Sequence, residues 1–442
     1  MYDFPDFYCA GRVLNRRESP YTYEPLRTCE HAVNSGGAFR SKFFRANPAI
    51  AVPAPLPAYD FVPYMLLARL SPRTASMIDG IAIVAAVAAC LIALAALGVP
   101  AGLAVAALFL STLYMELNTG QVVPFALVAF TFCGLALARR RDFLAGILAV
   151  LTAIEPSVGL PVTLATFLFV PRARWAIGLA SVILAALALR LVGGSTLVQY
   201  LSSVLPAQAA SEIHFPYQYS LTYLLAFVGV SPDAARVAGA ASYLLMLIIG
   251  LWIASAASRR LERRELIAFI PALCALIGGT YLHPEELCFA IPALLIMAPM
   301  ARGVSRVALA LALCALAIPW LLVWGSKQLF LASIFVCVII LLRLQIGMRI
   351  AFGSLCIIAA IVYALELHPP HLPVPTASLR PYAASELVQD EWRSYAGSRS
   401  SSDPLWIFIK LPTWAALLIG LFVAARCAAD AKAASQDKKP LG

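Results

Sequence analysis

Carboxylates and histidines capable of acid–base chemistry recur between the long apolar stretches of this chain. Asp3 and Asp6 come first, beside aromatic residues near the start of the sequence. The later ones are Glu116, Glu155, Glu212, His214, His283, Glu285 and Glu286. A carboxylate placed beside a hydroxyl can accept its proton while the oxygen attacks an electrophile. The connections that carry these residues are therefore candidates for a catalytic site.

Basic residues occupy the alternate connections of the chain. They are Arg139, Arg140, Arg141, Arg172, Arg174, Arg259, Arg260, Arg263, Arg264, Arg302, Arg306, Arg343, Arg349, Arg426, Lys432, Lys438 and Lys439. Short loops rich in Arg and Lys face the cytoplasm in membrane proteins. The carboxylates and histidines are therefore expected on the opposite, non-cytoplasmic face.

The composition places the chain in a membrane. Of its 442 residues, 61% are hydrophobic and only 13% are charged, which is typical of a multi-pass integral membrane protein rather than a soluble one. The net charge of +10 is spread over turns and does not form one stripe, so it indicates contact with anionic membrane lipids and no nucleic-acid partner. We expect a bacterial plasma membrane.

The predicted fold is all-α: a polytopic bundle of about 11–13 helices, several of them short or broken, around an outward-facing cavity. The candidate spans are residues 77–97, 103–116, 122–138, 143–154, 157–170, 175–193, 233–257, 266–281, 285–299, 307–325, 329–343, 350–366 and 405–425. A helix that crosses ~30 Å of hydrocarbon needs about 20 residues. The shorter pieces must therefore pack inside the protein, and the breaks after Glu116 and Glu155 should line the cavity.

Four regions follow from this pattern. Residues 1–76 are an outer segment in which 58–70 form an interfacial helix, with Tyr59, Phe61 and Tyr64 at headgroup depth. Residues 77–366 form the transmembrane core, 367–404 an outer loop, and 405–442 the last span with a cytoplasmic tail. A second outer loop covers 194–232. The long loops suit a substrate lid or an acceptor platform, and the second half of 367–404 is expected to hold a short amphipathic helix.

The start of the sequence lacks the basic and apolar regions of a cleavable signal peptide. Because residue 1 is expected outside, either a first helix precedes it or the helices that follow carry the short segment across. Cys9 and Cys29 share this outer segment and could form a disulfide in an oxidising compartment. The sequence leaves that pairing open.

Several short motifs, in order, resemble those of one enzyme family. The string from Asp3 to Leu14, followed by Ser19-Pro20-Tyr21, resembles the aspartate-bearing first outer loop of glycosyltransferase family 87, in the GT-C superfamily. Residues 118–122 (Asn-Thr-Gly-Gln-Val) resemble its Asn-x-Gly-Gln turn, and 145–156 its Ala-Gly helix. Residues 218–221 (Gln-Tyr-Ser-Leu) resemble a Gln-Ser-Leu element, and His283 ahead of 291–293 (Ile-Pro-Ala) a histidine-led span. The resemblance extends to about Met300.

This chain departs from the family pattern at one of these motifs. Glu155 stands where the family often has lysine, so that position is not expected to hold an anionic phosphate through a positive charge.

The resemblance implies transfer of a hexose, typically mannose, from a polyprenyl-phosphate donor to the hydroxyl of a glycan or glycolipid acceptor at the outer face. Asp3 is the candidate base, Asp6 is the alternative one helical turn away, and His283 is a further catalytic candidate. The leaving phosphate needs positive charge or hydrogen-bond donors, for which the outer candidates are Arg12, His283, Lys327, Arg380 and Arg393. The candidate substrate-binding residues are Arg12, Tyr21, Asn118, Gln121, Glu155, His214, Gln218, Lys327 and Arg380.

Structural roles compete with these assignments. Asp3 on its own is as typical of a helix cap as of a catalyst, and Asn118 and Gln121 can satisfy the backbone at a broken helix. Glu155 precedes a proline and can act as a cap. A metal site at His283, Glu285 and Glu286 is not expected, because no second histidine has ligand spacing. The sequence contains no Asp-x-Asp motif and no Gly-rich phosphate loop, so we expect neither a nucleotide donor nor a cofactor.

Two other functions share some of these features. A transporter or flippase of lipid-linked glycans should have broken helices in two related halves at mid-membrane, whereas this chain has no internal repeat and gathers its polar groups at one face. A glycan polymerase would also use long outer loops, and the sequence does not distinguish it from a transferase.

Overall fold

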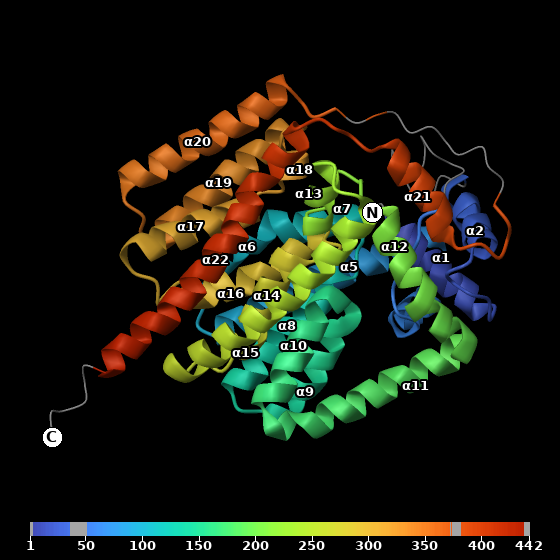
Figure 1. Cartoon of the computed structure of the whole chain (residues 1–442), viewed down its shortest axis with the longest axis horizontal. Coiled ribbons are helices and arrows are strands. Elements are labelled where there is room, and N and C mark those ends of the chain that lie inside the picture. Colours follow the sequence, from blue (N-terminus) through green and yellow to red (C-terminus); the bar gives the residue numbers. More distant parts are fainter. Residues whose placement is uncertain (1–2, 36–50, 372, 374–381, 437–442) are drawn as a thin grey trace.

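The computed structural model describes residues 3–35, 51–371, 373 and 382–436, and within these ranges it is helical without a named strand (Figure 1). Six of the described helical stretches are long and apolar enough to span a membrane. They are Pro72–Ala96, Ala101–Thr119, Pro171–Ser211, Pro232–Arg260, Met348–Leu367 and Leu405–Asp430. The expected all-α polytopic bundle is confirmed.

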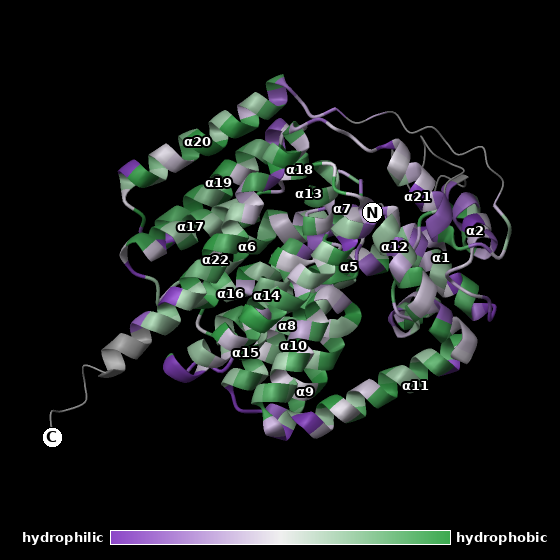
Figure 2. Cartoon of the chain, viewed as in Figure 1, coloured by the Kyte–Doolittle hydropathy of each residue, from purple (hydrophilic) through white to green (hydrophobic). Residues whose placement is uncertain are grey.

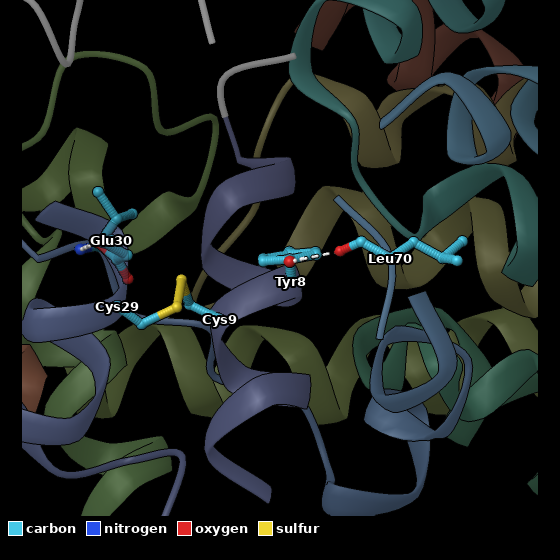
Figure 3. Close-up of a disulfide and its surroundings, with 6 residues drawn as sticks. Tyr8, Cys9, Cys29, Glu30 and Leu70 are labelled. Carbon is cyan, nitrogen blue, oxygen red and sulfur yellow. Dashed lines mark hydrogen bonds between the residues drawn. A yellow bond between two sulfur atoms is a disulfide. The ribbon is translucent and has the colours of Figure 1, made fainter. Parts of the chain in front are cut away.

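The N-terminal helices form a small unit of their own, α1 (Phe4–Asn15), α2 (Tyr23–Ser35), the 3-10 helix η1 (Ala58–Phe61) and α4 (Val62–Leu67). A disulfide between Cys9 and Cys29 joins α1 to α2, with 5.6 Å between the Cα atoms (Figure 3). Tyr8 donates a hydrogen bond of 2.9 Å to the Leu70 carbonyl beyond α4. The disulfide and this hydrogen bond attach α1 to both neighbouring segments.

The expected interfacial helix over 58–70 is wrong in two respects. The segment is a 3-10 turn followed by one short α-helix, and two of its three named aromatic residues are buried within the protein. Phe61 and Tyr64 are 0% and 2% exposed, because α4 packs directly on α1. A Cβ on Gly11 would lie 2.4 Å from the Tyr64 backbone, so only glycine permits this approach.

The first half of the membrane bundle alternates long and short helices. Its elements are α5 (Pro72–Ala96), α6 (Ala101–Leu108), the π-helical η2 (Phe109–Tyr114), α7 (Met115–Thr119), α8 (Val123–Ala138), α9 (Asp142–Leu151), η3 (Thr152–Ile154), α10 (Pro156–Phe169), η4 (Pro171–Ala173) and α11 (Arg174–Gln199). These bounds follow the predicted spans closely. The π-helical segment η2 comes directly before Glu116, in keeping with the tendency of π segments to lie at functional sites.

The predicted loop over 194–232 is largely helical, which corrects the sequence interpretation. After a kink at Gly193, α11 continues through η5 (Tyr200–Val204) into α12 (Leu205–Ser211), and α13 (Leu221–Phe227) follows. Gly193 has φ = 76°, a conformation that glycine adopts without strain. The helix is interrupted at this residue and resumes directly after it. The resulting arm connects the bundle to the N-terminal unit (Figure 1).

The second half contains α14 (Pro232–Arg260), α15 (Leu266–Gly278), η6 (Glu285–Phe289), α16 (Ala290–Met297), α17 (Gly303–Ala317), α18 (Trp320–Val323), α19 (Lys327–Arg343), α20 (Met348–Leu367), α21 (Val388–Ser398) and α22 (Leu405–Gln436). The single span expected over 307–325 is wrong, since the helix stops at Ala317. Pro319 has no amide hydrogen to continue it. The amphipathic helix expected within 367–404 is present as α21.

Small residues let the central helices approach closely. A Cβ on Gly278 of α15 would lie 2.6 Å from the Ser242 carbonyl oxygen on α14, and one on Gly134 of α8 would meet the Phe269 ring at 2.2 Å. Close backbone contact of this kind is the usual source of helix association in membranes. Phe269 and Phe289 both pack edge-on against Phe130, with centroids 5.0 and 5.5 Å away. The short helix α15 is therefore buried within protein, as its length requires.

Basic turns and acidic turns lie at opposite ends of the bundle. Arg264 pairs with Asp142 at 2.8 Å, and Arg263 donates to the Leu97 carbonyl at 3.4 Å. Arg306 donates to Gln345 at 3.2 Å, so this basic end joins the starts of α6, α9, α15 and α17 to the end of α19. Polar residues gather in the turns of the bundle and in the N-terminal helices, whereas the long helices of the bundle are mostly hydrophobic (Figure 2).

Candidate functional site

The first carboxylate of the chain meets the Asn-to-Gln turn. Gln121 donates a hydrogen bond of 2.6 Å to Oδ2 of Asp3, and the Asp3 amide donates to the Thr119 carbonyl at 2.7 Å. The turn is formed by Gly120, whose φ of 79° ends α7 in the left-handed region. The backbone of this turn thus holds Asp3 at the start of α1. Thr119, which accepts the hydrogen bond from Asp3, lies three residues after Glu116 on α7.

A histidine–carboxylate pair lies nearby, in which Glu212 is buried and His283 is partly exposed. Nε2 of His283 is 2.6 Å from Oε2 of Glu212. Gln218 donates to the same oxygen at 2.8 Å, while Oε1 accepts from Trp392 at 2.8 Å and Gln208 at 3.0 Å. Glu212 is only 3% exposed, so these donors replace the water that it loses on burial.

The loop after Glu212 is tied to the His283 turn through its backbone. The Tyr219 amide donates to the Leu282 carbonyl at 2.8 Å, and the Leu282 amide donates to the Gln218 side chain at 2.9 Å. The indole of Trp414 on α22 donates to the Tyr219 carbonyl at 2.9 Å. His283 is also stacked on Tyr281, with centroids 4.7 Å apart. Its ring is therefore held in one orientation.

A second pair of carboxylates shares one hydroxyl. Oγ of Ser157 lies 3.3 Å from a carboxylate oxygen of Glu155 and 3.3 Å from one of Glu286. The Ser157 carbonyl accepts from Tyr243 of α14 at 2.9 Å. The start of α10 is thus joined to η6, directly after His283, and the Glu155 break lies in the same cluster as the Asn-to-Gln turn.

The pKa values of Asp3 and Glu212 are shifted in opposite directions. Burial raises the pKa of Asp3 and the nearby Glu285 carboxylate adds to this, against the lowering by Gln121, so that the pKa is about 7. Burial also acts to raise the pKa of Glu212, but His283 and the hydrogen-bond donors outweigh it and the pKa falls below its usual value. Asp3 therefore changes charge near neutral pH, whereas Glu212 stays ionised.

The imidazole of His283 is a cation in this setting. Burial acts to lower its pKa, but the Glu212 carboxylate and its hydrogen bond outweigh burial and raise the pKa to about 10. Among the described residues, no hydrogen bond besides the one to Glu212 reaches the ring. His283 can therefore direct its second N–H and its positive charge toward a bound anion.

Two further carboxyls, those of Glu285 and Glu286, have raised pKa values. Burial raises the pKa of Glu286, and the neighbouring Glu155 carboxylate raises it further. Burial also raises the pKa of Glu285, and its Oε2 has no hydrogen-bond partner in the described part of the chain. A carboxyl can donate a hydrogen bond when it is protonated, and the raised pKa values favour that form.

The structure brings Asp3, Gln121, Glu155, Gln218 and His283 together, out of the residues that the sequence suggested. The other candidates lie elsewhere. Tyr21 is buried in the N-terminal unit and donates to the Leu56 carbonyl at 2.9 Å, and Asn118 donates to the Tyr114 carbonyl of its own helix at 2.6 Å. Asp6 is 1% exposed, and its Oδ1 has no partner among the described residues.

The basic candidates are not part of this cluster. Arg12 is partly exposed on the last turn of α1, and Lys327 is exposed at the start of α19. Arg380 lies outside the described residues, and Arg393 is exposed on α21. His214 is partly exposed two residues after Glu212, where burial lowers its pKa. His283 is thus the candidate cation that the fold places beside the carboxylates.

Sequence reasoning missed the residues that hold Glu212. It placed Glu212 and Trp392 on the outer face without connecting them, and it did not single out Gln208. The i, i+4 spacing of Gln208 and Glu212 at the end of α12 is a detectable signal. The Trp392 contact joins positions 180 residues apart, and no local pattern reveals such a pairing. Within the described ranges, no group of three or more ligand residues is arranged to hold a metal ion.

Comparison with known proteins identifies a family for just over half of the chain. The sequence model of glycosyltransferase family 87 matches residues 55–284. The matched range includes Gln121, Glu155, Glu212, Gln218 and His283, and it begins after Asp3. No curated protein matches the chain significantly.

Proposed function

The chain belongs to glycosyltransferase family 87, and we propose that this membrane glycosyltransferase moves a hexose from a polyprenyl-phosphate donor to an acceptor hydroxyl. Mannose is the sugar that we propose first, and the non-cytoplasmic face is the proposed side of reaction. The observation that carries the proposal is the single cluster in which Asp3, near its pKa, lies with the His283–Glu212 pair. A base and a cation are the two groups that this transfer needs.

Asp3 is proposed as the base. As the acceptor oxygen forms its bond to the anomeric carbon, its proton passes to the Asp3 carboxylate, and the bond from that carbon to the phosphate oxygen breaks. Positioned proton transfer of this kind contributes typically about 10²- to 10⁴-fold to the rate. The pKa of about 7 suits this role, because a base works best when its pKa is near the working pH.

His283 is proposed to stabilise the leaving group. The bonding electrons pass to the polyprenyl phosphate, whose negative charge is stabilised by a preorganised cation or donor. The ion pair with Glu212 keeps His283 protonated and fixes its direction. Glu212 is thus a positioning residue, since it acts through His283 and not on the substrate.

Glu285 and Glu286 are proposed to bind the sugar. Glu285 and Glu286 are buried at 7% and 4% exposure and follow His283 directly. In their protonated form they can donate to sugar hydroxyls or to a phosphate oxygen without repelling its charge. Protonation of these two groups would reduce the repulsion that an anionic donor meets in a cluster of carboxylates.

The proposal is tested by following radiolabelled mannose in liposomes that contain the purified full-length protein. We expect transfer from polyprenyl-phosphate mannose and none from nucleotide-linked mannose. Asp3→Asn should lower the rate by about 10²-fold or more. Asp233→Asn is the matched control, because Asp233 is an exposed carboxylate at the start of α14 that pairs with Arg236 of the same helix. Undiminished transfer by Asp3→Asn would reject Asp3 as base, and use of the nucleotide sugar would reject the lipid donor.

The side of reaction is tested separately by labelling intact cells with a membrane-impermeant thiol reagent. A cysteine at position 233 (Asp233→Cys) should react from outside, whereas one at position 349 (Arg349→Cys) should react only after permeabilisation. The unsubstituted protein controls for its exposed Cys356. The reverse pattern would move the site to the cytoplasmic face.

A further inference from the structure

A long apolar groove runs along the outside of the bundle between α6 and α19. Its volume is about 670 Å³. Its walls include Val105 and Phe109 on one side and Phe335 and Leu342 on the other. These four side chains are 44–66% exposed. The start of α6 and the end of α19 lie at the basic end of the bundle, and both helices extend from there toward the candidate site. The groove between them therefore opens toward the surrounding lipid chains.

A single cation closes one end of the groove. Arg343 is the charged residue in its lining, and its guanidinium lies against the start of α6, where a Cβ on Gly102 would be 3.1 Å from Nη2. Within the described ranges, no ion pair or hydrogen bond of Arg343 is found. A guanidinium with five donors and no partner fits a phosphate group.

The length of the groove matches the acyl chain of a lipid in one leaflet. From Ala332 to Arg343 the groove follows twelve residues of α19, and the eleven steps between them span ~16 Å at 1.5 Å per residue, about half of the ~30 Å of bilayer hydrocarbon. That is the depth of one leaflet. Gly102 and Glu116 lie at opposite ends of one continuous helical stretch, ~21 Å apart by the same rise. A donor with its phosphate at the site therefore could not place that phosphate on Arg343.

We propose that this groove binds an anionic phospholipid of the leaflet at the basic end, with one acyl chain between α6 and α19 and its phosphate on Arg343. The bound lipid would brace the helical stretch that continues through η2 to Glu116 and the turn that holds Asp3. This site does not depend on the sugar donor or on the chemistry proposed above.

The test measures thermal stabilisation of the purified full-length protein in a neutral detergent. Dioleoyl-phosphatidylglycerol is titrated against dioleoyl-phosphatidylcholine, which has the same chains and no net charge. A ligand that binds only the folded state raises the unfolding midpoint, and we expect the anionic lipid to do so at the lower concentration. Arg343→Gln should raise the half-maximal concentration of the anionic lipid about tenfold, the loss of a charge-assisted contact.

Matched variants separate the groove from general charge effects. Arg349→Gln removes an exposed arginine from the same end of the bundle outside the groove and should respond like the unsubstituted protein. Val105→Trp should fill the groove and abolish the preference for the anionic lipid, while Arg343→Lys should retain part of it.

Three results would overturn the proposal. They are equal stabilisation by the two lipids, equal weakening by Arg343→Gln and Arg349→Gln, or an unchanged preference in Val105→Trp. Stabilisation by polyprenyl phosphate that is stronger than by phosphatidylglycerol and is lost in Arg343→Gln would assign the groove to a different lipid and also overturn it. If Arg343→Gln does not fold, Val105→Trp and Arg343→Lys still decide the question.

Discussion

The two carboxylates near His283, those of Glu212 and Asp3, differ in their hydrogen bonding and in their pKa values. Glu212 accepts hydrogen bonds from four side chains, those of Gln208, Gln218, His283 and Trp392. Asp3 accepts one from a described side chain, that of Gln121. Burial acts to raise both pKa values, but the His283 charge and these donors outweigh it at Glu212, whereas the Glu285 charge adds to it at Asp3. One carboxylate is therefore a fixed counter-charge and the other a group that can gain and lose a proton.

The largest effect on this contrast should come from Glu212→Gln. Without the Glu212 charge and its hydrogen bond, burial is opposed only by the lesser effects of Glu285 and Glu286, so the pKa of His283 should fall from about 10 and the neutral imidazole should become more populated at pH 7. Loss of a preorganised charge stabiliser should lower the transfer rate by about 10²-fold. Diethylpyrocarbonate, which modifies neutral imidazole, should then label His283, with peptide mass spectrometry to distinguish it from the other histidines. An unreactive His283 in this variant would contradict its assignment as a cation held by Glu212.

A smaller effect is expected from Trp392→Phe. This change removes one hydrogen bond to a charged acceptor but leaves the Glu212 charge in place, so the transfer rate should fall about tenfold. The matched control is Trp414→Phe, which removes an indole hydrogen bond to a backbone carbonyl of the Tyr219 loop. If Trp392→Phe is as active as the unsubstituted protein, α21 contributes only packing.

The smallest effect should appear on the Asp3 side as a pH dependence. Asp3 must be ionised to act as a base, so activity should rise with pH through about 7 and fall below it. Gln121→Met removes the hydrogen bond that lowers the pKa of Asp3, while the lowering by the His283 charge remains, so the acid limb of the rate profile should move to higher pH. Because a neutral hydrogen bond contributes modestly, the rate at pH 7 should fall roughly threefold. If the acid limb does not move, the group that titrates is not the Asp3 carboxylate bonded to Gln121.

The disulfide differs from these site residues because it acts on the N-terminal unit as a whole. Cys9→Ser should remove about 3 kcal/mol of stability, the expected cost of opening a loop of about 20 residues. A lower midpoint of thermal unfolding measures this. The pKa of Asp3 should be unchanged once the protein is folded, because the hydrogen bonds of Asp3 to Thr119 and Gln121 do not involve the disulfide.

The sequence by itself determined the class of the fold, the family and the alternation of basic and acidic turns. Hydrophobic length and loop charge are local quantities, and the bilayer converts them directly into spans and ends. The family motifs at Gln121, Glu155, Gln218 and His283 are local too. The sequence misread 194–232 as a loop, because Gly193 and Gly194 interrupt the apolar pattern although the chain resumes a helix after them.

Only the tertiary structure decided which outer groups meet. Lys327 and Arg12 had the right charge and the expected side of the membrane, but neither joins the carboxylates. Trp392 and Glu212 meet because α21 packs on α12, and Arg343 closes a groove because α19 packs on α6. Such contacts depend on helix packing between distant segments, which hydropathy does not encode. The pKa of Asp3 depends on them as well, since burial and the Glu285 charge exist only in the folded protein.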